Sequence, residues 1–96
     1  MNLTPGATIN VYFVDDVKIR SLNAQYLGRD YPTDVLSFRL DEKISPDCYY
    51  LGDVVISLPS AKRNADENNR DINQELAELT KHGVLHLLGV HHEGDE

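Results

Sequence analysis

Three histidines near the carboxyl end constrain the fold of this chain more than any other feature. His82, His86 and His92 lie in the segment HGVLHLLGVHH. On an α-helix, residues four apart lie one turn apart on the same face, so the imidazoles of His82 and His86 are expected side by side. Gly89 can adopt the left-handed conformation that ends a helix. The segment therefore predicts a helix ending near residue 88 and a return of the chain that brings His92 beside the other two histidines.

Three converging imidazoles are typical of a metal site. A catalytic zinc ion commonly takes three protein ligands and leaves its fourth position to water, whose pKa it lowers to about 7. Nickel, copper and iron also accept nitrogen ligands. We therefore expect one Zn²⁺, or Ni²⁺ or another divalent metal in its place, bound by His82, His86 and His92, with His91 as a competing third ligand. A hydrolase is the direct functional inference.

The same spacing occurs in the long zinc-protease signature HExxHxxGxxH, with one difference. Gly83 stands where the glutamate that deprotonates the water is expected. Glu93 is the only near candidate to replace it in a protease mechanism. A small zinc metalloprotease is thus an alternative, and it lacks its strongest support.

Composition narrows the class of protein further. The 96 residues suffice for one domain with a modest core, and no apolar run approaches the roughly 20 residues of a membrane span, so no membrane partner is expected. Nine basic and sixteen acidic residues argue against extended binding of duplex nucleic acid, although a small cleft holding a metal ion remains compatible with this charge. Cys48 is the only cysteine, which excludes an intrachain disulfide and favours the cytoplasm.

Hydrophobic patterning predicts an α+β domain over residues 1–96. Strands are expected at residues 8–14, 35–40 and 51–57, and residues 41–50 are expected to form a polar loop. Helices are expected at residues 17–26, 58–68 and 71–88. The prediction is a small mixed sheet of about three strands with three helices, in which the histidine helix is last and longest.

Local signals support the helix ends. Asp15 and Asp16 are candidates for the first N-cap, Gly28 for the stop of that helix, and Asp71 for the cap of the last helix. Pro59 fits the first turn of the second helix. Three apolar residues of the last helix recur at helical spacing and are expected to face the sheet, namely Ile72, Leu76 and Leu79.

Two upstream segments extend the histidine pattern into a family resemblance. LNAQYLGRDYPTDVLSF and LGDVVIS, together with HGVLHLLGVHHE, closely resemble the YbeY family of metal-dependent endoribonucleases over residues 9–93. The resemblance implies an α+β fold, zinc bound by His82, His86 and His92, and cleavage of single-stranded RNA. It also implies a role in ribosomal RNA maturation, especially at the 3′ end of the small-subunit RNA, and in ribosome quality control, with the ribosome or its small subunit as partner.

The chain departs from the family pattern in three respects. Tyr26-Leu27 stands where the family usually has Tyr-Arg, an arginine whose planar fork suits a phosphate; Arg29 lies close by in the sequence. His91 stands where aspartate commonly precedes the third histidine. Family members are also longer at both ends, so we expect this chain to lack an opening strand–helix unit and the helix that follows the histidines.

Further polar residues are candidates for a cleft beside the metal: Arg29, Asp34, Ser37 and Asp53. In the alternative interpretation Asp34 caps a turn, Ser37 points outward from its strand and Asp53 bonds to backbone. Two acidic residues of the histidine helix, Glu75 and Glu78, are expected on its solvated surface, or else as partners of the histidines. Three basic residues, Lys62, Arg63 and Arg70, are expected on a solvated face, with contact to an RNA backbone as the alternative.

The sequence therefore predicts a zinc-dependent, single-strand-specific endoribonuclease. The principal alternative is a metal-stabilised domain that binds RNA or the ribosome with weak or no catalytic activity, an interpretation favoured by Leu27. The oligomeric state is not indicated by the sequence.

Overall fold

The computed structural model describes residues 6–89, so the predictions for His91, His92 and Glu93 lie outside the described residues. Its elements follow in the order β1 (Ala7–Val14), α1 (Asp16–Leu27), β2 (Val35–Ser45), β3 (Cys48–Ser57), α2 (Leu58–Glu67) and α3 (Ile72–Leu87). The predicted α+β class is confirmed, and α3 is the longest of the helices within this range. No helix in residues 6–89 is long and apolar enough to span a membrane.

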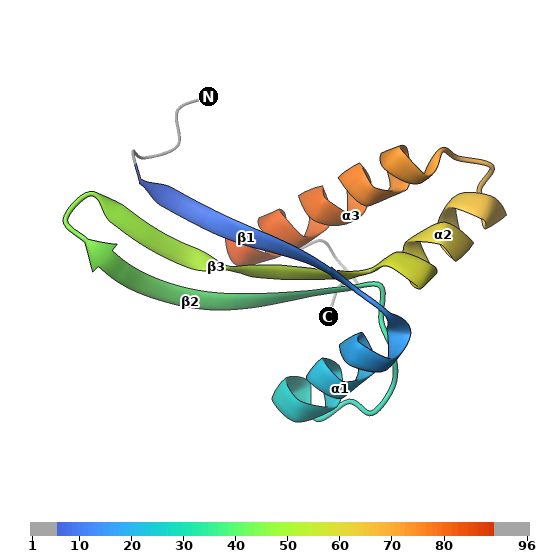
Figure 1. Cartoon of the computed structure of the whole chain (residues 1–96), viewed down its shortest axis with the longest axis horizontal. Helices are drawn as coiled ribbons and strands as arrows, with labels where there is room; N and C mark the ends of the chain where they lie inside the picture. Colours follow the sequence, from blue (N-terminus) through green and yellow to red (C-terminus); the bar gives the residue numbers. More distant parts are fainter. Residues whose placement is uncertain (1–5, 90–96) are drawn as a thin grey trace.

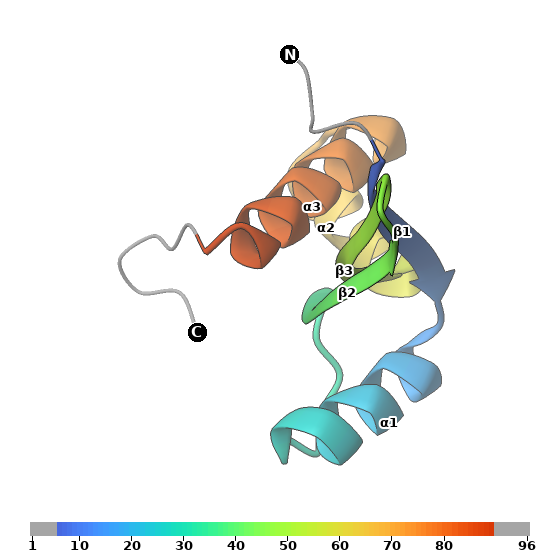
Figure 2. The same cartoon turned by 90° about the vertical axis from the view of Figure 1, so that its left-hand side faces the viewer.

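The three strands form one mixed sheet in the order β1-β3-β2. β1 runs parallel to the central strand β3, and β2 runs antiparallel to it. Alternate residues of β3 pack on opposite faces, as the period of two along a strand requires. Val54 and Ile56 pack with residues of α2 and α3, whereas Val55 packs with Ile19 of α1. Helices α2 and α3 thus cover one face of the sheet, and α1 lies against the other (Figures 1 and 2).

The prediction of a polar loop at residues 41–50 is wrong. β2 continues to Ser45 and β3 begins at Cys48, so this segment is a β-hairpin (Figure 1). Cross-strand pairs join Glu42 to Tyr50 and Lys43 to Tyr49. The far part of β2 is exposed on both faces, so its residues show no apolar alternation. Pairing with β3 makes the strand, and a pattern search along one segment does not detect that pairing.

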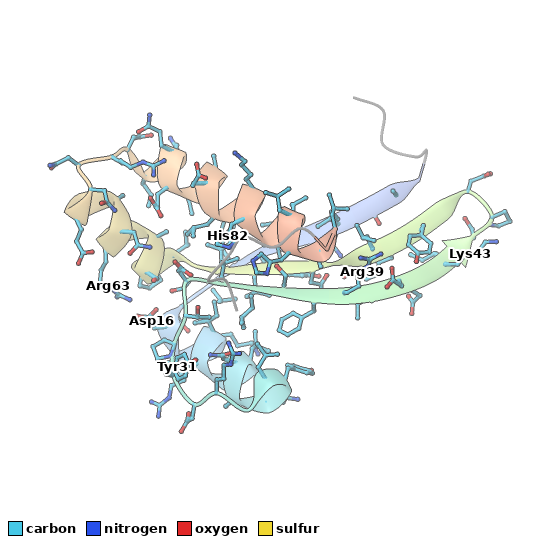
Figure 3. The ribbon with its side chains drawn as sticks, turned by 180° about the vertical axis from the view of Figure 1, so that it is seen from behind. Asp16, Tyr31, Arg39, Lys43, Arg63 and His82 are labelled. Carbon is cyan, nitrogen blue, oxygen red and sulfur yellow. The ribbon has the colours of Figure 1, made fainter. Side chains whose placement is uncertain are left out.

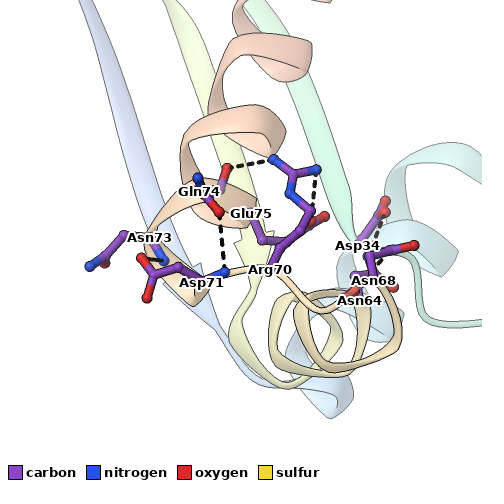
Figure 4. Close-up of polar contacts among 8 residues, drawn as sticks. All are labelled: Asp34, Asn64, Asn68, Arg70, Asp71, Asn73, Gln74 and Glu75. Carbon is purple, nitrogen blue, oxygen red and sulfur yellow. Dashed lines mark hydrogen bonds and ion pairs between the residues drawn. The ribbon is translucent and has the colours of Figure 1, made fainter.

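The predicted helix ends are confirmed. Asp15 is the N-cap of α1, and Gly28 ends this helix in the left-handed conformation with φ of 69°. Asp71 caps α3 in a capping box with Gln74, which lies beside it in Figure 4. Gly89 follows the end of α3 with φ of 83°, as the histidine segment predicts.

The packing of α3 is confirmed at three positions and corrected at one. Ile72, Leu76 and Leu79 pack in the core cluster between α3 and the sheet. Glu75 is not on the solvated surface, because only 7% of the residue is exposed. Its carboxylate lies 3.5 Å from Nη1 of Arg70 at the start of α3 (Figure 4), and this ion pair explains the burial of the charge.

Candidate metal centre and cleft

His82 and His86 lie one turn apart on α3, and their ring nitrogens converge. The two Nε2 atoms are 3.1 Å apart, and the ring centroids are separated by 4.8 Å with the planes at 41°. Both residues are partly buried against the sheet, and His82 is labelled in Figure 3. The predicted juxtaposition of these two imidazoles is therefore observed.

The geometry of this pair fits a tetrahedral metal ion. Two nitrogens at about 2.0–2.1 Å from a tetrahedral zinc lie about 3.3 Å from each other. The separation of 3.1 Å between the two Nε2 atoms is close to this value. Within residues 6–89 no group of three metal-binding side chains occurs, and the predicted third ligand, His92, lies outside that range. Zinc binding by all three histidines stays a prediction.

Gly83, the residue between the two histidines, is buried against the sheet. A Cβ atom at this position would lie 2.5 Å from Cγ1 of Val54, closer than side chains approach one another. The absence of a side chain lets α3 lie directly on β3. The position where a zinc protease carries its glutamate therefore faces the packed interior, and the structure has no room for that base here.

Ser37 points toward α3, which contradicts the alternative interpretation that it projects outward and agrees with its prediction as a cleft residue. Its Oγ donates a hydrogen bond of 2.9 Å to the carbonyl oxygen of Gly83. Val35 and Ser37 share the face of β2 that packs against α3, because they are two residues apart on the strand. Ser37 thus links the β2 edge of the sheet to the turn of α3 that carries the histidines.

A cavity of about 600 Å³ lies between α3, β2 and the C-terminal part of α1 with the loop that follows it. It brings together five of the predicted site residues, namely Arg29, Asp34, Ser37, His82 and His86. Leu27 also lines it, so the position where the resemblance places an arginine contributes an apolar side chain to this cavity.

Asp34 has structural contacts as well as a place in the cavity lining. Its backbone carbonyl accepts a hydrogen bond of 2.9 Å from the amide of Ser57. Its Oδ2 lies 3.5 Å from Nδ2 of Asn64 on α2 (Figure 4). The carboxylate is therefore oriented from α2 while the residue borders the histidine cavity.

The prediction that Asp53 belongs to the histidine cleft is wrong. Along β3 Val54 faces α3, so Asp53 faces the opposite side of the sheet, where it lines a second cavity with Lys18 and Tyr26. Its carboxylate accepts a hydrogen bond from the hydroxyl of Tyr50 rather than from backbone. This bond raises the pKa of Tyr50 to about 12.

Arg39 is a cavity residue that the sequence reasoning missed. It lines the cavity with the histidines, and its Nη1 donates to the carbonyl of Leu87 at the end of α3. Its Nε donates to Oδ1 of Asp41 over 2.7 Å. Counting in steps of two from Val35, through Ser37, places Arg39 on the α3 face, so strand alternation was a signal that identifies it.

The other charged candidates lie outside the lining of this cavity. Arg63 pairs with Asp16 at 3.1 Å and Arg70 pairs with Glu75, while Lys62 is exposed. Glu78 is exposed, as predicted. The expectation of a solvated face is confirmed for Lys62, Arg63 and Arg70, and the two arginines also join ion pairs there.

Comparison with known proteins gives consistent matches. The family profile described as endoribonuclease YbeY matches residues 1–96. The endoribonuclease YbeY of Desulforamulus reducens is 50% identical over 100 residues, which cover 97% of this chain and 64% of the relative. That of Geobacillus thermodenitrificans is 46% identical, over 99% of this chain and 66% of the relative.

A solved structure agrees with these matches. The solution structure of a Thermotoga maritima protein superimposes with a TM-score of 0.61 at 38% identity. The match covers 92% of this chain and 55% of that one. The chain thus spans between about half and two thirds of the length of these relatives.

Proposed function

The chain belongs to the endoribonuclease YbeY family, and on that premise we propose that it is a zinc-dependent endoribonuclease that cleaves single-stranded RNA. The observation that supports this proposal is the convergence of the His82 and His86 Nε2 atoms, 3.1 Å apart, at the wall of a cavity of about 600 Å³. Single-stranded RNA is the form of substrate that we propose for this cavity, because an unpaired strand can bring its phosphodiester groups and bases to the side chains of the lining.

In this proposal His82, His86 and the predicted ligand His92 hold the metal. Bound zinc supplies a positive charge beside the phosphodiester and lowers the pKa of water to about 7. The residues of the chain hold the site and the substrate. Ser37 holds the histidine-bearing turn through Gly83, and the guanidinium of Arg29 offers a planar set of donors to a phosphate.

Asp34 has a complementary part in this cavity. Its carboxylate is an acceptor in a cleft that otherwise carries guanidinium and imidazole groups. RNA presents 2′-hydroxyl donors beside every phosphate. We assign to Asp34 a hydrogen bond with such a hydroxyl, which distinguishes RNA from DNA at this site.

The finer substrate is proposed from family membership. We propose that the chain acts in the cytoplasm on ribosomal RNA, with the 3′ end of the small-subunit RNA as principal substrate, and that it associates with the ribosome or its small subunit in quality control. The second candidate is a metal-stabilised domain that binds RNA or the ribosome without cleaving it. Leu27 favours this candidate, because an apolar side chain lines the cavity where an arginine is expected.

The experiment compares the purified chain with its His86→Ala variant. Each is incubated with a fluorescent, unstructured RNA in zinc, in chelator, and in chelator followed by added zinc. We expect metal-dependent cleavage that His86→Ala abolishes, and one zinc per wild-type chain by elemental analysis. Lys81→Ala, an exposed change on the same helix, is the matched control and should retain cleavage.

Two other results would contradict the proposal or favour the second candidate function. Cleavage that is unchanged by chelator and by His86→Ala contradicts the proposal, because it must come from another site or a contaminating nuclease. Zinc binding and RNA binding without cleavage favour the second candidate function.

A further inference from the structure

An irregularity in the backbone of β2 follows Arg39 and helps to hold this residue in the histidine cavity. The pairing of β2 with β3 shifts register between Arg39 and Glu42, and Asp41 within this irregularity has φ of 52°. Few residues other than glycine adopt this left-handed conformation. Bulges of this kind re-aim side chains and are frequent beside active sites. Here the bulge directs the Asp41 carboxylate toward Arg39.

The Asp41 carboxylate joins two side chains. Its Oδ1 accepts a hydrogen bond of 2.7 Å from Nε of Arg39 and one of 2.8 Å from the hydroxyl of Tyr49 on β3. These bonds lower the pKa of Asp41, with Arg39 as the larger cause. The carboxylate is therefore ionised near neutral pH and holds the guanidinium from one side.

The end of α3 holds the guanidinium from another direction. Nη1 of Arg39 donates to the carbonyl of Leu87, the residue that follows His86. The last carbonyls of a helix have no partner within the helix and carry partial negative charge, so a cation is favourable there. In Figure 3 Arg39 lies near the last turn of α3. Groups from β2, β3 and α3 thus orient one arginine beside the candidate metal ligands.

The orientation leaves part of the guanidinium available. Arg39 has five N–H donors, and its hydrogen bonds within residues 6–89 use Nε and Nη1. Its side chain is 48% exposed and borders the same cavity as His86. A guanidinium that is held but not enclosed is well suited to bind a phosphate through two parallel hydrogen bonds.

The charge of the lining points to the same class of ligand. The cavity is bordered by Arg29, Arg39 and a single carboxylate, that of Asp34, in a chain with a formal net charge of −7. Asp41 pairs with Arg39, so the formal charges of the two arginines and the two carboxylates balance at this cleft, whereas the molecule as a whole is acidic. A polyanion is therefore repelled less at this cleft than by most of the remaining surface.

We propose that Arg39 binds a backbone phosphate of the RNA, on the hairpin side of the two histidines, while Asp41 and Tyr49 hold its guanidinium in place. This inference rests on the proposed function and deepens it, because it names the path of the strand: from Arg29, past His82 and His86, to Arg39 along β2. Arg39 is a substrate-binding residue, and Tyr49 acts on binding only by positioning it.

The test measures binding without cleavage. A fluorescein-labelled 12-nucleotide oligouridylate is titrated with the full chain in chelator, and its anisotropy is recorded over a range of KCl concentrations. We expect Arg39→Ala to weaken binding on the order of tenfold, as loss of a charged hydrogen bond does. The slope of log affinity against log salt should also fall by about 0.7, the value for one contact to a single strand.

Two further variants separate binding from folding and from general electrostatics. Arg20→Ala removes an exposed arginine that also pairs through Nε, with Asp30 at 3.0 Å outside the cavity lining, and it should leave the salt slope unchanged. Tyr49→Phe removes only a hydroxyl and no charge, so it should weaken binding by about two- to threefold, less than Arg39→Ala does, because Tyr49 acts only through the position of Arg39. Arg39→Lys retains the charge and the slope but loses the paired donors, and it guards against a misfolded alanine variant.

The outcomes are distinguishable from those of the cleavage assay. Arg39→Ala with wild-type affinity and slope overturns the inference, even if the chain cleaves RNA. Equal losses in Arg20→Ala and Arg39→Ala also overturn it, because they indicate net charge rather than a site. A reduced slope in Arg39→Ala alone supports it, even if no metal-dependent cleavage is found.

Discussion

The hydroxyl of Ser37 donates a hydrogen bond of 2.9 Å to the carbonyl of Gly83, and this bond joins the histidine-bearing turn of α3 to β2. One turn further along, Arg39 repeats the contact by donating to the carbonyl of Leu87. Two residues of a strand advance about 6.6 Å and four residues of a helix about 6 Å, so the two contacts stay in step. His82 and His86 each directly precede one of the two contacted residues, so they are positioned by regular elements rather than by a loop.

Gly83→Ala should destabilise the chain although alanine is the better helix former. The added Cβ would meet Cγ1 of the fully buried Val54 at 2.5 Å, so α3 must move away from β3. Overpacking costs about 1–3 kcal/mol, and the helix propensity of alanine returns about 1 kcal/mol. We expect a net loss of up to about 2 kcal/mol, measured by urea unfolding.

A second site on α3 supplies the control. Ala77 is exposed, so Ala77→Gly should cost about 1 kcal/mol through propensity alone. A Gly83→Ala variant more stable than the wild type would show that the contact with Val54 does not limit the approach of α3.

Much of the fold was predictable because its signals are local. The caps at Asp15 and Asp71, the left-handed glycine at position 28 and the apolar face of α3 each act within a few residues of chain. The hairpin at residues 41–50 was not predictable in this way. Its β2 arm is exposed on both faces and is a strand because it pairs with β3, which is a property of two segments taken together.

The candidate site also has features that one segment predicts and features that depend on packing between segments. The side-by-side placement of His82 and His86 follows from helix periodicity alone. Whether the side chains of Ser37, Arg39 and Asp53 point toward the histidines depends on which face of the sheet α3 covers. The sequence of one strand does not indicate which face that is. The burial of Glu75 depends on Arg70, whose ion pair offsets the cost of burying the carboxylate.

Zinc should stabilise the chain through the histidine pair. A ligand present at about 100 times its Kd adds about 2.7 kcal/mol to the stability of the folded state. For a domain of this size each kcal/mol raises Tm by about 4–8 °C. We expect a zinc-dependent rise in Tm that is lost in His82→Ala and in His86→Ala.

The exposed Lys81→Ala variant should show the full zinc-dependent rise. An equal shift in both histidine variants would mean that the ion binds elsewhere on the acidic surface.

The Asp16 carboxylate should make stability depend on pH in the acid range. Its Oδ1 accepts from Ser57 at 2.7 Å and its Oδ2 from Arg63 at 3.1 Å, and these bonds, with Ser57 as the larger cause, lower the pKa of Asp16 below 3.8. A lowered pKa in the folded state means that the contribution is present above about pH 3.8 and is lost as pH falls through the folded pKa. The difference in urea midpoint between wild type and Asp16→Asn should therefore shrink with acidification.

The exposed Glu78→Gln variant controls for the titration of other carboxylates. A constant difference between wild type and Asp16→Asn from neutral to acid pH would contradict the assignment.

Asn23 should connect the stability of α1 to the shape of the cavity. The residue is 1% exposed, and its Nδ2 donates a hydrogen bond of 2.9 Å to the carbonyl of Tyr31 in the loop that leads to β2. The same loop carries Arg29 to the cavity wall. Asn23→Ala removes this partly buried hydrogen bond, which costs about 0.5–1.5 kcal/mol. It should also weaken RNA binding, because Arg29 is then less well positioned.

Asn23→Asp provides the sharper comparison. It keeps the shape of the side chain but places a carboxylate oxygen against the Tyr31 carbonyl, so two acceptors face each other in a buried site. Oδ1 of Asn23 has no hydrogen-bond partner within residues 6–89, so the substitution gains nothing on that side from the residues described. We therefore expect Asn23→Asp to be less stable than Asn23→Ala in urea unfolding at neutral pH. The reverse order would show that the bond to Tyr31 does not hold the loop.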